Sequence, residues 1–394
     1  MTLAYLDNAA AEPIREAARQ AVLDAWERAG TVGLNPQAAH AAGREAAFLL
    51  DDARARVAAC VGADPAEVVF TSGGTEGDVI AVRGAVREGR VIIHSALDHP
   101  AIAQTAAQAG PVRVLPLRAD GGLDMDAARG IIAGDAGALE GAEGAGESAP
   151  PALVAATAVA SETGVIVPIA DLVALVRDTW GEQTVVHCDA VQAIGRIPCD
   201  FHALGVDTLA IAGHKFGGPA GVGVLLVRRG VALTSPITGG GQERGLRSGT
   251  PNVALAQGLA AAIEEATAQR EAEMARHHSL RSRLLGGIAG IEGVRVATSA
   301  PAVESITMLL AAGCEAEPLL FALDQAGVAA SAGSACHTGV ARPSPALVAQ
   351  GLSDAEAIGS LRVSFGWSTS EADVDALVAA LPGAVEAARA FAAR

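Results

Sequence analysis

The chain alternates short apolar runs with stretches in which apolar residues recur every three or four positions. Helical spacing covers residues 14–28 and 41–61, and a long helical stretch begins at Val253 and continues to about residue 285. Apolar runs that predict strands lie at 68–70, 91–94, 112–115, 152–157, 184–188, 208–212 and 222–227. Helical or turn segments separate most of these runs, which is the pattern of an α/β domain with a mainly parallel sheet.

The last third of the chain predicts a smaller α+β unit. Apolar runs occur at 305–310 and 361–365, and a final helix begins at Glu371. We therefore expect a large domain of residues 14–255 and a small domain formed by residues 1–13 and 256–394. The stretch 133–151, rich in Ala, Gly and Glu and closed by two prolines, predicts a flexible surface insertion without an assigned function.

Composition and charge exclude several classes of function. The chain has 394 residues, of which 51% are hydrophobic and 18% charged, so it is long enough for one large core and a second, smaller one. Its formal net charge is −16 without a clustered Lys/Arg stripe, so direct binding to nucleic acid is not expected. The first residues lack a basic segment followed by an apolar run, and no stretch approaches the roughly 18 apolar residues of a membrane helix. We expect a cytoplasmic protein.

The five cysteines predict neither a disulfide framework nor a metal site. They are odd in number, widely spaced and form no C-x-x-C pair. At most one or two are therefore expected to matter chemically among Cys60, Cys188, Cys199, Cys314 and Cys336.

A Gly-rich turn follows the first predicted strand of the large sheet. In VVFTSGGTE, residues 68–76, the strand ends in Thr-Ser-Gly-Gly-Thr and a helical run follows. Small residues such as Gly74 let the backbone close around a phosphate, the helix N-terminus offers unpaired N–H groups, and Thr75 adds a hydroxyl. A lone turn of this kind is more often an ordinary connection, so its meaning depends on what accompanies it.

An acidic residue follows another predicted strand. In TVVHCDAVQAIG, residues 184–195, Asp189 stands just past the apolar run, where open α/β sheets gather ligand-binding groups. A carboxylate there is suited to hold the protonated ring nitrogen of a pyridoxal cofactor, and Gln192 is placed to reach the phenolic oxygen of the same ring. An Asp that caps the next helix is an equally good interpretation of this residue alone.

Lys215, in IAGHKFGGP, is the only lysine of the chain. The other residues counted as Lys or Arg are all arginines. A guanidinium stays protonated at working pH, but an amine can lose its proton and condense with an aldehyde. A bias toward Arg can therefore replace surface lysines but not a Schiff-base lysine. Chance survival of one lysine is the alternative, and the position after a strand favours the chemical interpretation.

With these residues in view, the chain resembles the cysteine desulfurases, in particular the housekeeping group of this class V aminotransferase family of fold-type I pyridoxal-phosphate enzymes. The similarity covers nearly the whole length through motifs in the same order. They are YLDNAA (5–10), NPQAAH (35–40), VVFTSGGTEGD (68–78), LDHPA (97–101), HCDAVQAIG (187–195), AGHKFGGPAGVG (212–223), GGGQERGLRSGT (239–250), SAGSACHTG (331–339) and LRVSFG (361–366).

The resemblance implies a role for each matching residue around pyridoxal 5'-phosphate. Lys215 forms the Schiff base with the cofactor, and His99 stacks on its ring and assists proton transfer. A homodimer is implied as well, because one phosphate contact comes from the partner subunit. The other cofactor-binding positions implied are Asp189 and Gln192 at the ring, Ser161, and Gly74, Thr75, His214 and Thr250 at the phosphate, with Thr250 acting across the dimer interface.

The substrate positions come from the same resemblance. Cys336, in a small, polar segment that predicts a mobile loop, takes the sulfur of L-cysteine as a persulfide and leaves L-alanine. Arg362 binds the substrate carboxylate, for which a bidentate guanidinium is suited, and Asn35 assists. The sulfur then passes to acceptor proteins that serve iron–sulfur cluster assembly or tRNA thiolation.

Three residues depart from the usual family pattern. Ser161 and Val79 stand where the family usually has Asn, and Ala212 stands where it usually has a phosphate-binding Ser. Loss of a ring contact and of a phosphate hydroxyl each removes about 0.5–1.5 kcal/mol of cofactor affinity, so we expect looser cofactor binding or a diverged role, with the fold retained. Two alternatives stay open: a related pyridoxal-phosphate lyase or aminotransferase, which would not need Cys336, and a weakly active scaffold that binds sulfur-acceptor proteins.

Overall fold

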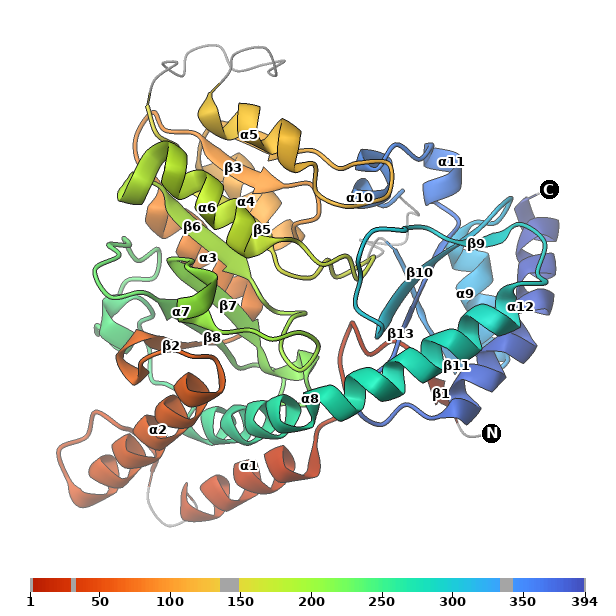
Figure 1. Ribbon diagram of the computed structural model, residues 1–394. Coiled ribbons are helices and arrows are strands. Elements are labelled where there is room, and N and C mark those ends of the chain that lie inside the picture. The colour runs from red at the N-terminus through yellow and green to blue at the C-terminus, as the bar shows by residue number, and fades with distance from the viewer. Residues whose placement is uncertain (1–2, 30–32, 135–148, 334–342, 393–394) are drawn as a thin grey trace.

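The larger part of the molecule is built on a seven-stranded sheet (Figure 1). The computed structural model describes residues 3–29, 33–134, 149–333 and 343–392. Across the sheet, the strands are β2 (Val68–Thr71), β8 (Gly223–Val227), β7 (Thr208–Ala212), β6 (Val185–Asp189), β5 (Leu153–Thr157), β3 (Ile92–Ser95) and β4 (Val112–Leu115).

Five neighbouring strands of this sheet, from β7 to β4, run parallel. Only β8 is antiparallel to its neighbours β7 and β2, so the predicted mainly parallel sheet is confirmed. The register pairs Thr157 with Asp189 and Asp189 with Ala210. The carboxyl ends of β5, β6 and β7 therefore lie side by side, which is where such sheets bind ligands.

Helices cover both faces of the large sheet (Figure 1), and the strand sequences show why. Along β5, Val154 and Ala156 pack into the main core, whereas Leu153 and Ala155 pack into a separate cluster under α3 and α4. Because both faces are buried, the strand is a continuous apolar run. The helices are α1 (Glu16–Ala29), α2 (Ala41–Cys60), α3 (Gly74–Ala85), α4 (Pro100–Ala109), α5 (Met125–Ala133), α6 (Ile169–Trp180), α7 (Phe201–Leu204) and α8 (Val253–Ile288).

The remaining elements form the predicted smaller α+β unit around a core of their own. Its four-stranded antiparallel sheet has the order β12-β13-β10-β9, and β1 pairs in parallel with β11. The elements are β1 (Ala4–Tyr5), β9 (Val294–Val296), β10 (Ile306–Ala311), α9 (Ala316–Gln325), β11 (Val328–Ala329), β12 (Ser331–Ala332), α10 (Pro345–Ala349), α11 (Asp354–Ala357), β13 (Ser360–Ser364) and α12 (Glu371–Ala392).

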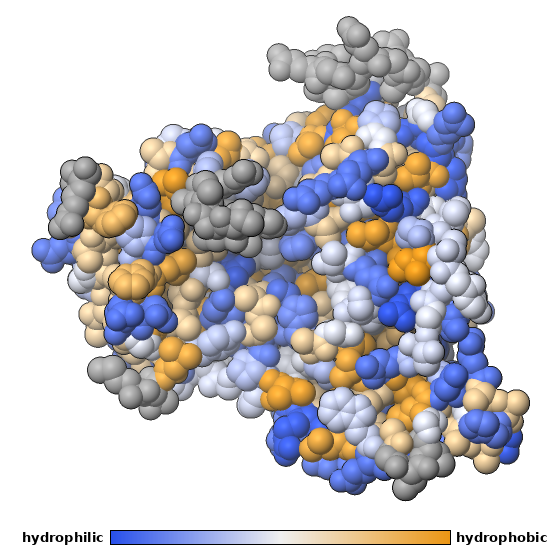
Figure 2. Space-filling model, turned by 180° about the vertical axis from the view of Figure 1, so that it is seen from behind, coloured by the Kyte–Doolittle hydropathy of each residue, from blue (hydrophilic) through white to orange (hydrophobic). Residues whose placement is uncertain are grey.

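Helix α8 belongs to both parts of the molecule, and Figure 1 shows it running from one to the other. Leu259 and Ile263 in its first half lie in the main core, whereas Leu280 and Leu284 in its second half lie in the smaller one. The expected boundary after residue 255 therefore falls within the first turn of a continuous helix. Seen from behind, the surface mixes polar and apolar residues and is hollowed between the two parts (Figure 2).

Two predicted features lie wholly or largely outside the described residues. They are the Cys336 segment and most of the 133–151 insertion. Within the described part of the chain, no helix has the length and apolar character needed to cross a membrane.

Candidate active site

A cavity of about 120 Å³ opens beside the carboxyl ends of β6 and β7. The structure brings together around it most of the residues that the sequence singled out. Those that line it are Gly74, Thr75, His99, Ser161, Asp189, Gln192, His214 and Lys215.

Lys215 ends the short 3-10 helix Gly213–Lys215, which directly follows β7. Its Nζ donates to the carbonyl oxygens of Ala9 at 2.8 Å and Ala10 at 2.9 Å. Burial, followed by the charges of Arg362 and Arg196, lowers the pKa of Lys215 to about 8. A substantial share of the amine is therefore neutral, and nucleophilic, at mildly alkaline pH.

Asp189 is the last residue of β6 and is buried beside the cavity. Its Oδ1 accepts a hydrogen bond from the Val191 backbone N–H at 2.9 Å, so it stabilises the turn after the strand as well as lining the cavity. Burial, followed by the neighbouring Asp78 carboxyl, raises the pKa of Asp189 to about 7. A cationic N–H beside this carboxyl would keep it ionised.

Gln192 offers the cavity an acceptor that has no partner among the described residues. Its Nε2 donates to the carbonyl oxygen of Ala9 at 2.8 Å. Its Oε1 is buried and makes no hydrogen bond with any described residue. Because buried polar atoms are nearly always paired, this oxygen indicates a ligand with a hydroxyl or N–H group at this place.

The Gly-rich turn enters the cavity at the N-terminus of α3. Gly74 is the first residue of the helix, and a Cβ placed on it would lie 2.4 Å from Cγ2 of Val191. Glycine is thus required for the close approach of this turn to the turn after β6. The neighbouring Thr75 exposes its side chain to the cavity, next to the unpaired N–H groups of the helix start.

Two histidines at the cavity are mainly uncharged at neutral pH. Nδ1 of His99 accepts from the Ala101 N–H at 3.1 Å at the start of α4, so the ring proton of neutral His99 is on Nε2. Burial, and then the charge of Lys215, lowers the pKa of His99. The same two causes lower the pKa of His214 to about 4.

Arg362 lies on β13, between the cavity rim and the N-terminal segment of the chain. Its Nη1 donates to the Ser161 carbonyl oxygen at 3.0 Å, and its Nη2 donates to Asp7 Oδ1 at 2.9 Å. Its Nε is buried without a partner among the described residues. One N–H group of the guanidinium is therefore bound to the Asp7 carboxylate, whereas other N–H donors remain for a ligand.

Two predicted positions lie away from the cavity of this chain. Thr250 is exposed at the end of the 239–250 segment, and Asn35 is exposed between α1 and α2, with its Oδ1 accepting from the Gln37 N–H at 3.0 Å. Neither lines the cavity. A hydrogen bond of 2.9 Å from Gln242 Nε2 to Gln37 Oε1 joins the two segments. Cys336 lies outside the described residues.

Sequence reasoning missed the part played by the first residues of the chain. Asp7 contacts Arg362, and the carbonyl oxygens of Ala9 and Ala10 hold Lys215. The motif YLDNAA pointed to this segment without giving any of its residues a role. A contact made by a backbone carbonyl cannot be recognised from the residue type. Within this segment, the carboxylate of Asp7 was therefore the side chain that could have indicated a contact.

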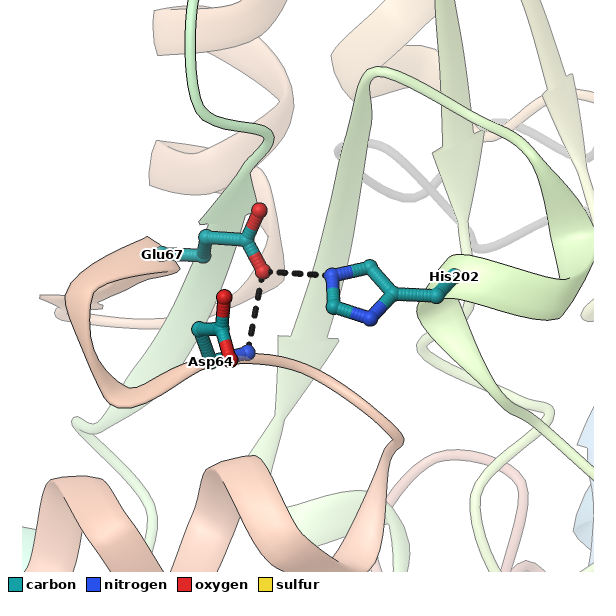
Figure 3. A group of neighbouring side chains, drawn as sticks. All are labelled: Asp64, Glu67 and His202. Carbon is teal, nitrogen blue, oxygen red and sulfur yellow. Dashed lines mark hydrogen bonds and ion pairs between the residues drawn. The ribbon is translucent and has the colours of Figure 1, made fainter.

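A second cluster of ligand-type side chains lies apart from the cavity: Asp64, Glu67 and His202 (Figure 3). Glu67 Oε2 accepts from the Asp64 N–H at 2.9 Å and lies 2.8 Å from His202 Nε2. The guanidinium of Arg229 contacts the Asp64 carboxylate, and its backbone N–H donates to Glu67 Oε1 at 3.1 Å. The carboxylates therefore have protein partners already and do not call for a metal ion.

Comparison with known proteins places this geometry in a family. Residues 4–377 match the family model described as aminotransferase class-V. The chain is 40% identical over 402 residues to an IscS-like cysteine desulfurase of Mycobacterium tuberculosis, covering 98% of this chain and 97% of that protein. It is 34% identical over 385 residues to the cysteine desulfurase IscS of Salmonella arizonae, covering 94% of this chain and 90% of that one.

Solved structures show the same fold. A NifS-like protein superposes with a TM-score of 0.85 at 28% identity, covering 98% of this chain and 100% of the other. A NifS-like protein of Rickettsia africae gives a TM-score of 0.86 at 26% identity, covering 98% and 100%. SspA, solved in complex with cysteine, gives 0.73 at 27% identity, covering 92% and 98%.

Proposed function

Since the chain belongs to the aminotransferase class-V family and is a cysteine desulfurase, we propose that its cavity binds pyridoxal 5'-phosphate and L-cysteine. The observation that carries this proposal is the placement of the only lysine. Lys215 lines one cavity together with Asp189 and Gln192, which offer a carboxyl and an unpaired acceptor. An aldehyde bound here would meet an amine whose pKa is lowered to about 8.

The residues present fit this cofactor. Asp189 would pair with the ring nitrogen, the unpaired Gln192 Oε1 would accept from the ring hydroxyl, and the α3 N-terminus with Thr75 and His214 would hold the phosphate. When bound, the cofactor supplies an electron-withdrawing ring that stabilises negative charge at the substrate α-carbon. The chain's own residues then determine where the substrate sits and where its protons go.

Lys215 is the group best placed to move the α-proton. Its neutral amine accepts a proton and its ammonium returns one, and a pKa near 8 makes both forms accessible at physiological pH. His99, neutral and protonated on Nε2, would stack on the ring and assist this transfer. Arg362 would bind the substrate carboxylate through its remaining N–H donors.

Cys336 is the proposed acceptor of the sulfur. Its thiolate would attack the substrate sulfur, so that one S–S bond forms while the Cβ–S bond of L-cysteine breaks. Protons added at carbon complete L-alanine, and Cys336 retains the sulfur as a persulfide. A second thiolate on a sulfur-acceptor protein could then take it, for iron–sulfur cluster assembly or tRNA thiolation.

We further propose that the enzyme is a homodimer. Thr250 and Asn35 are both exposed and lie outside the cavity of their own chain. Their segments are joined by the Gln242–Gln37 hydrogen bond, so they can reach a partner together. Thr250 would complete the phosphate site of the partner subunit.

The test is a pair of product assays on the purified protein. With L-cysteine and a thiol reductant, the wild type should form equal amounts of sulfide and alanine, and Cys336→Ser should form neither. Cys60→Ser is the matched control, because Cys60 is a half-buried thiol at the end of α2 that does not line the cavity.

Each other outcome points to a different function. Products that survive in Cys336→Ser would indicate a lyase that uses no protein thiol. No product from the wild type, together with no visible absorbance of a bound cofactor, would overturn the enzyme assignment of this cavity.

A further inference from the structure

The contact between Asp7 and Arg362 joins the two ends of the chain across 355 positions. Arg362 Nη2 donates to Asp7 Oδ1 at 2.9 Å, and the side chains of Arg362 and Asp7 are only 11% and 20% exposed. The second oxygen of Asp7 accepts from the Ser331 hydroxyl at 2.7 Å. Both carboxylate oxygens are thus engaged, and one of them occupies the arginine proposed to bind substrate.

We propose that Asp7 is a built-in counter-ion that weakens carboxylate binding at Arg362 and so sets the affinity for substrate and product. This inference rests on the proposed function, because it takes Arg362 as the carboxylate site. A substrate carboxylate on the remaining donors of the guanidinium would lie within a few ångströms of Asp7. At that distance two like charges repel appreciably in a partly buried site.

Asp7 is held firmly enough to act in this way. It forms a β-bridge with Ser364, two residues beyond Arg362 on the same strand. The hydroxyl of Ser364 accepts from the Ala9 N–H at 2.8 Å, and the Asn8 amide donates to the Ser364 carbonyl at 2.9 Å. The main chain on either side of Asp7 is therefore fixed to the strand that carries its partner.

A second carboxyl near Arg362 does not replace Asp7. Glu162 accepts a hydrogen bond from Ser344 and makes no contact with the guanidinium. Burial raises the pKa of Glu162 to about 7, so much of it is uncharged near neutral pH. Within the described part of the chain, Asp7 is the carboxylate in contact with the Arg362 guanidinium.

The same segment serves the lysine. The carbonyl oxygens of Ala9 and Ala10, two and three residues after Asp7, hold Lys215. One short stretch therefore positions the amine that would bind the cofactor and offsets the charge of the group that would bind the substrate carboxylate. This arrangement favours release of alanine, whose carboxylate would otherwise hold it to Arg362.

The experiment compares two ligands that differ only in the carboxylate. Holoenzyme is titrated with L-alanine and with L-alaninamide, and binding is followed by the absorbance of the bound cofactor. Asp7→Asn should bind L-alanine roughly tenfold more tightly than the wild type does, as expected for a lost like charge nearby. Its affinity for L-alaninamide, which carries no carboxylate, should change much less.

Two control variants separate charge from structure. Asp7→Glu keeps the charge and should bind L-alanine about as the wild type does. Asp375→Asn breaks a comparable contact with Arg283 on the surface and should leave both affinities unchanged. Weaker or unchanged binding of L-alanine by a folded Asp7→Asn, or equal tightening for both ligands, would overturn the proposal.

A third arm needs neither cofactor nor turnover. The cofactor-free chain is titrated with trifluoroacetate, a simple carboxylate, and binding is followed by fluorine NMR. Asp7→Asn should again bind more tightly, and Arg362→Gln should abolish the difference. If the wild type makes no alanine but Asp7→Asn still binds trifluoroacetate more tightly, the proposed function alone is refuted. If the wild type and Asp7→Asn bind trifluoroacetate equally well, the counter-ion role of Asp7 is refuted.

Discussion

Lys215 and Ala9 are joined by a hydrogen bond of 2.8 Å from the lysine Nζ to the alanine carbonyl oxygen. The same oxygen accepts from Gln192 Nε2 at 2.8 Å. The Ala9 carbonyl oxygen thus holds the side chains of both Lys215 and Gln192, although these residues lie far from it in the sequence. The segment does not itself line the cavity, but it holds in place two of the side chains that do.

The uniqueness of Lys215 makes its covalent role directly measurable. Reduction of the holoenzyme with borohydride should fix one cofactor per chain, and peptide mass spectrometry should find it on Lys215. Lys215→Arg, which keeps the charge but cannot form the bond, should carry no label. A label on the N-terminal amine, or none on the wild type, would contradict the assignment.

The lowered pKa of Lys215 predicts how cofactor attachment depends on pH. The amine must be neutral to react, so the attachment rate should rise with pH and reach half its maximum near pH 8. Arg362 and Arg196 lower this pKa, whereas Asp189 and Asp7 raise it. Asp7→Asn should therefore shift the midpoint to lower pH, as stopped-flow absorbance after mixing with cofactor would show.

The fold was largely predictable because the chain buries both faces of its sheet. Runs such as 208–212 and 222–227 carry almost no polar side chain, and they became β7 and β8. The cavity residues were predictable where a side chain ends a strand, as Asp189 does, or follows one closely, as Lys215 does.

The sequence could not predict which side chains far apart along the chain contact one another. Asp7 and Arg362 are 355 positions apart, and neither the apolar pattern nor the residue types say that they meet. The reversed direction of β8 was equally hidden, because an apolar run has no direction. Asn35 is a different case: its motif implied a place at the substrate, and in its own chain it lies outside the cavity, so that prediction stays open.

The buried pair of Asp78 and His187 predicts how stability depends on pH. Asp78 Oδ1 lies 3.1 Å from His187 Nε2, and Nδ1 of the same ring lies 2.8 Å from the Thr208 hydroxyl. Burial raises the pKa of Asp78 to about 8 and lowers that of His187 to about 4. At neutral pH the protonated carboxyl thus donates to Nε2, and Nδ1–H donates to Thr208.

Because Asp78 binds its proton more tightly in the folded state, it should make the protein less stable as pH rises. Between the unfolded pKa of 3.8 and the folded value of about 8, its share of the stability falls by up to about 1.4 kcal/mol per pH unit. Asp78→Asn can make the same hydrogen bond without titrating. Urea unfolding at pH 6 and 8.5 should show a smaller loss for this variant, and equal losses would contradict the neutral carboxyl.

Glu243 anchors the segment 239–250 to the edge of the large sheet. Its carboxylate accepts two hydrogen bonds of 2.9 Å from Arg54 and one of 2.8 Å from the Phe70 N–H, which β2 leaves free at the sheet edge. Glu243 and Arg244 both adopt positive φ, at 46° and 57°, which non-glycine residues rarely do. Strain of this kind persists only where strong contacts impose it.

Glu243→Ala should therefore cost about 2–4 kcal/mol of unfolding free energy, because it removes two charged hydrogen bonds to Arg54 and leaves the buried Phe70 N–H without its acceptor. The Arg54 guanidinium keeps its hydrogen bond to the Val68 carbonyl oxygen. The loss is measured by urea unfolding of the cofactor-free chain. Asp375→Ala, which breaks an exposed pair with Arg283, is the control and should change little. A loss for Glu243→Ala no larger than that of the control would show that the segment is not held by this contact.

The substitution Ala212→Ser tests whether the departure from the family pattern at this position weakens cofactor binding. Ala212 ends β7, lines the cavity and stands where the family usually has a phosphate-binding serine. Ala212→Ser should supply one more donor to the cofactor phosphate and tighten binding by about 0.5–1.5 kcal/mol, or roughly 2- to 12-fold. Ala210→Ser, on the same strand but not lining the cavity, is the matched control and should not tighten it. Cofactor dissociation constants from fluorescence titration measure both, and an unchanged affinity in Ala212→Ser would mean that the phosphate does not approach the end of β7.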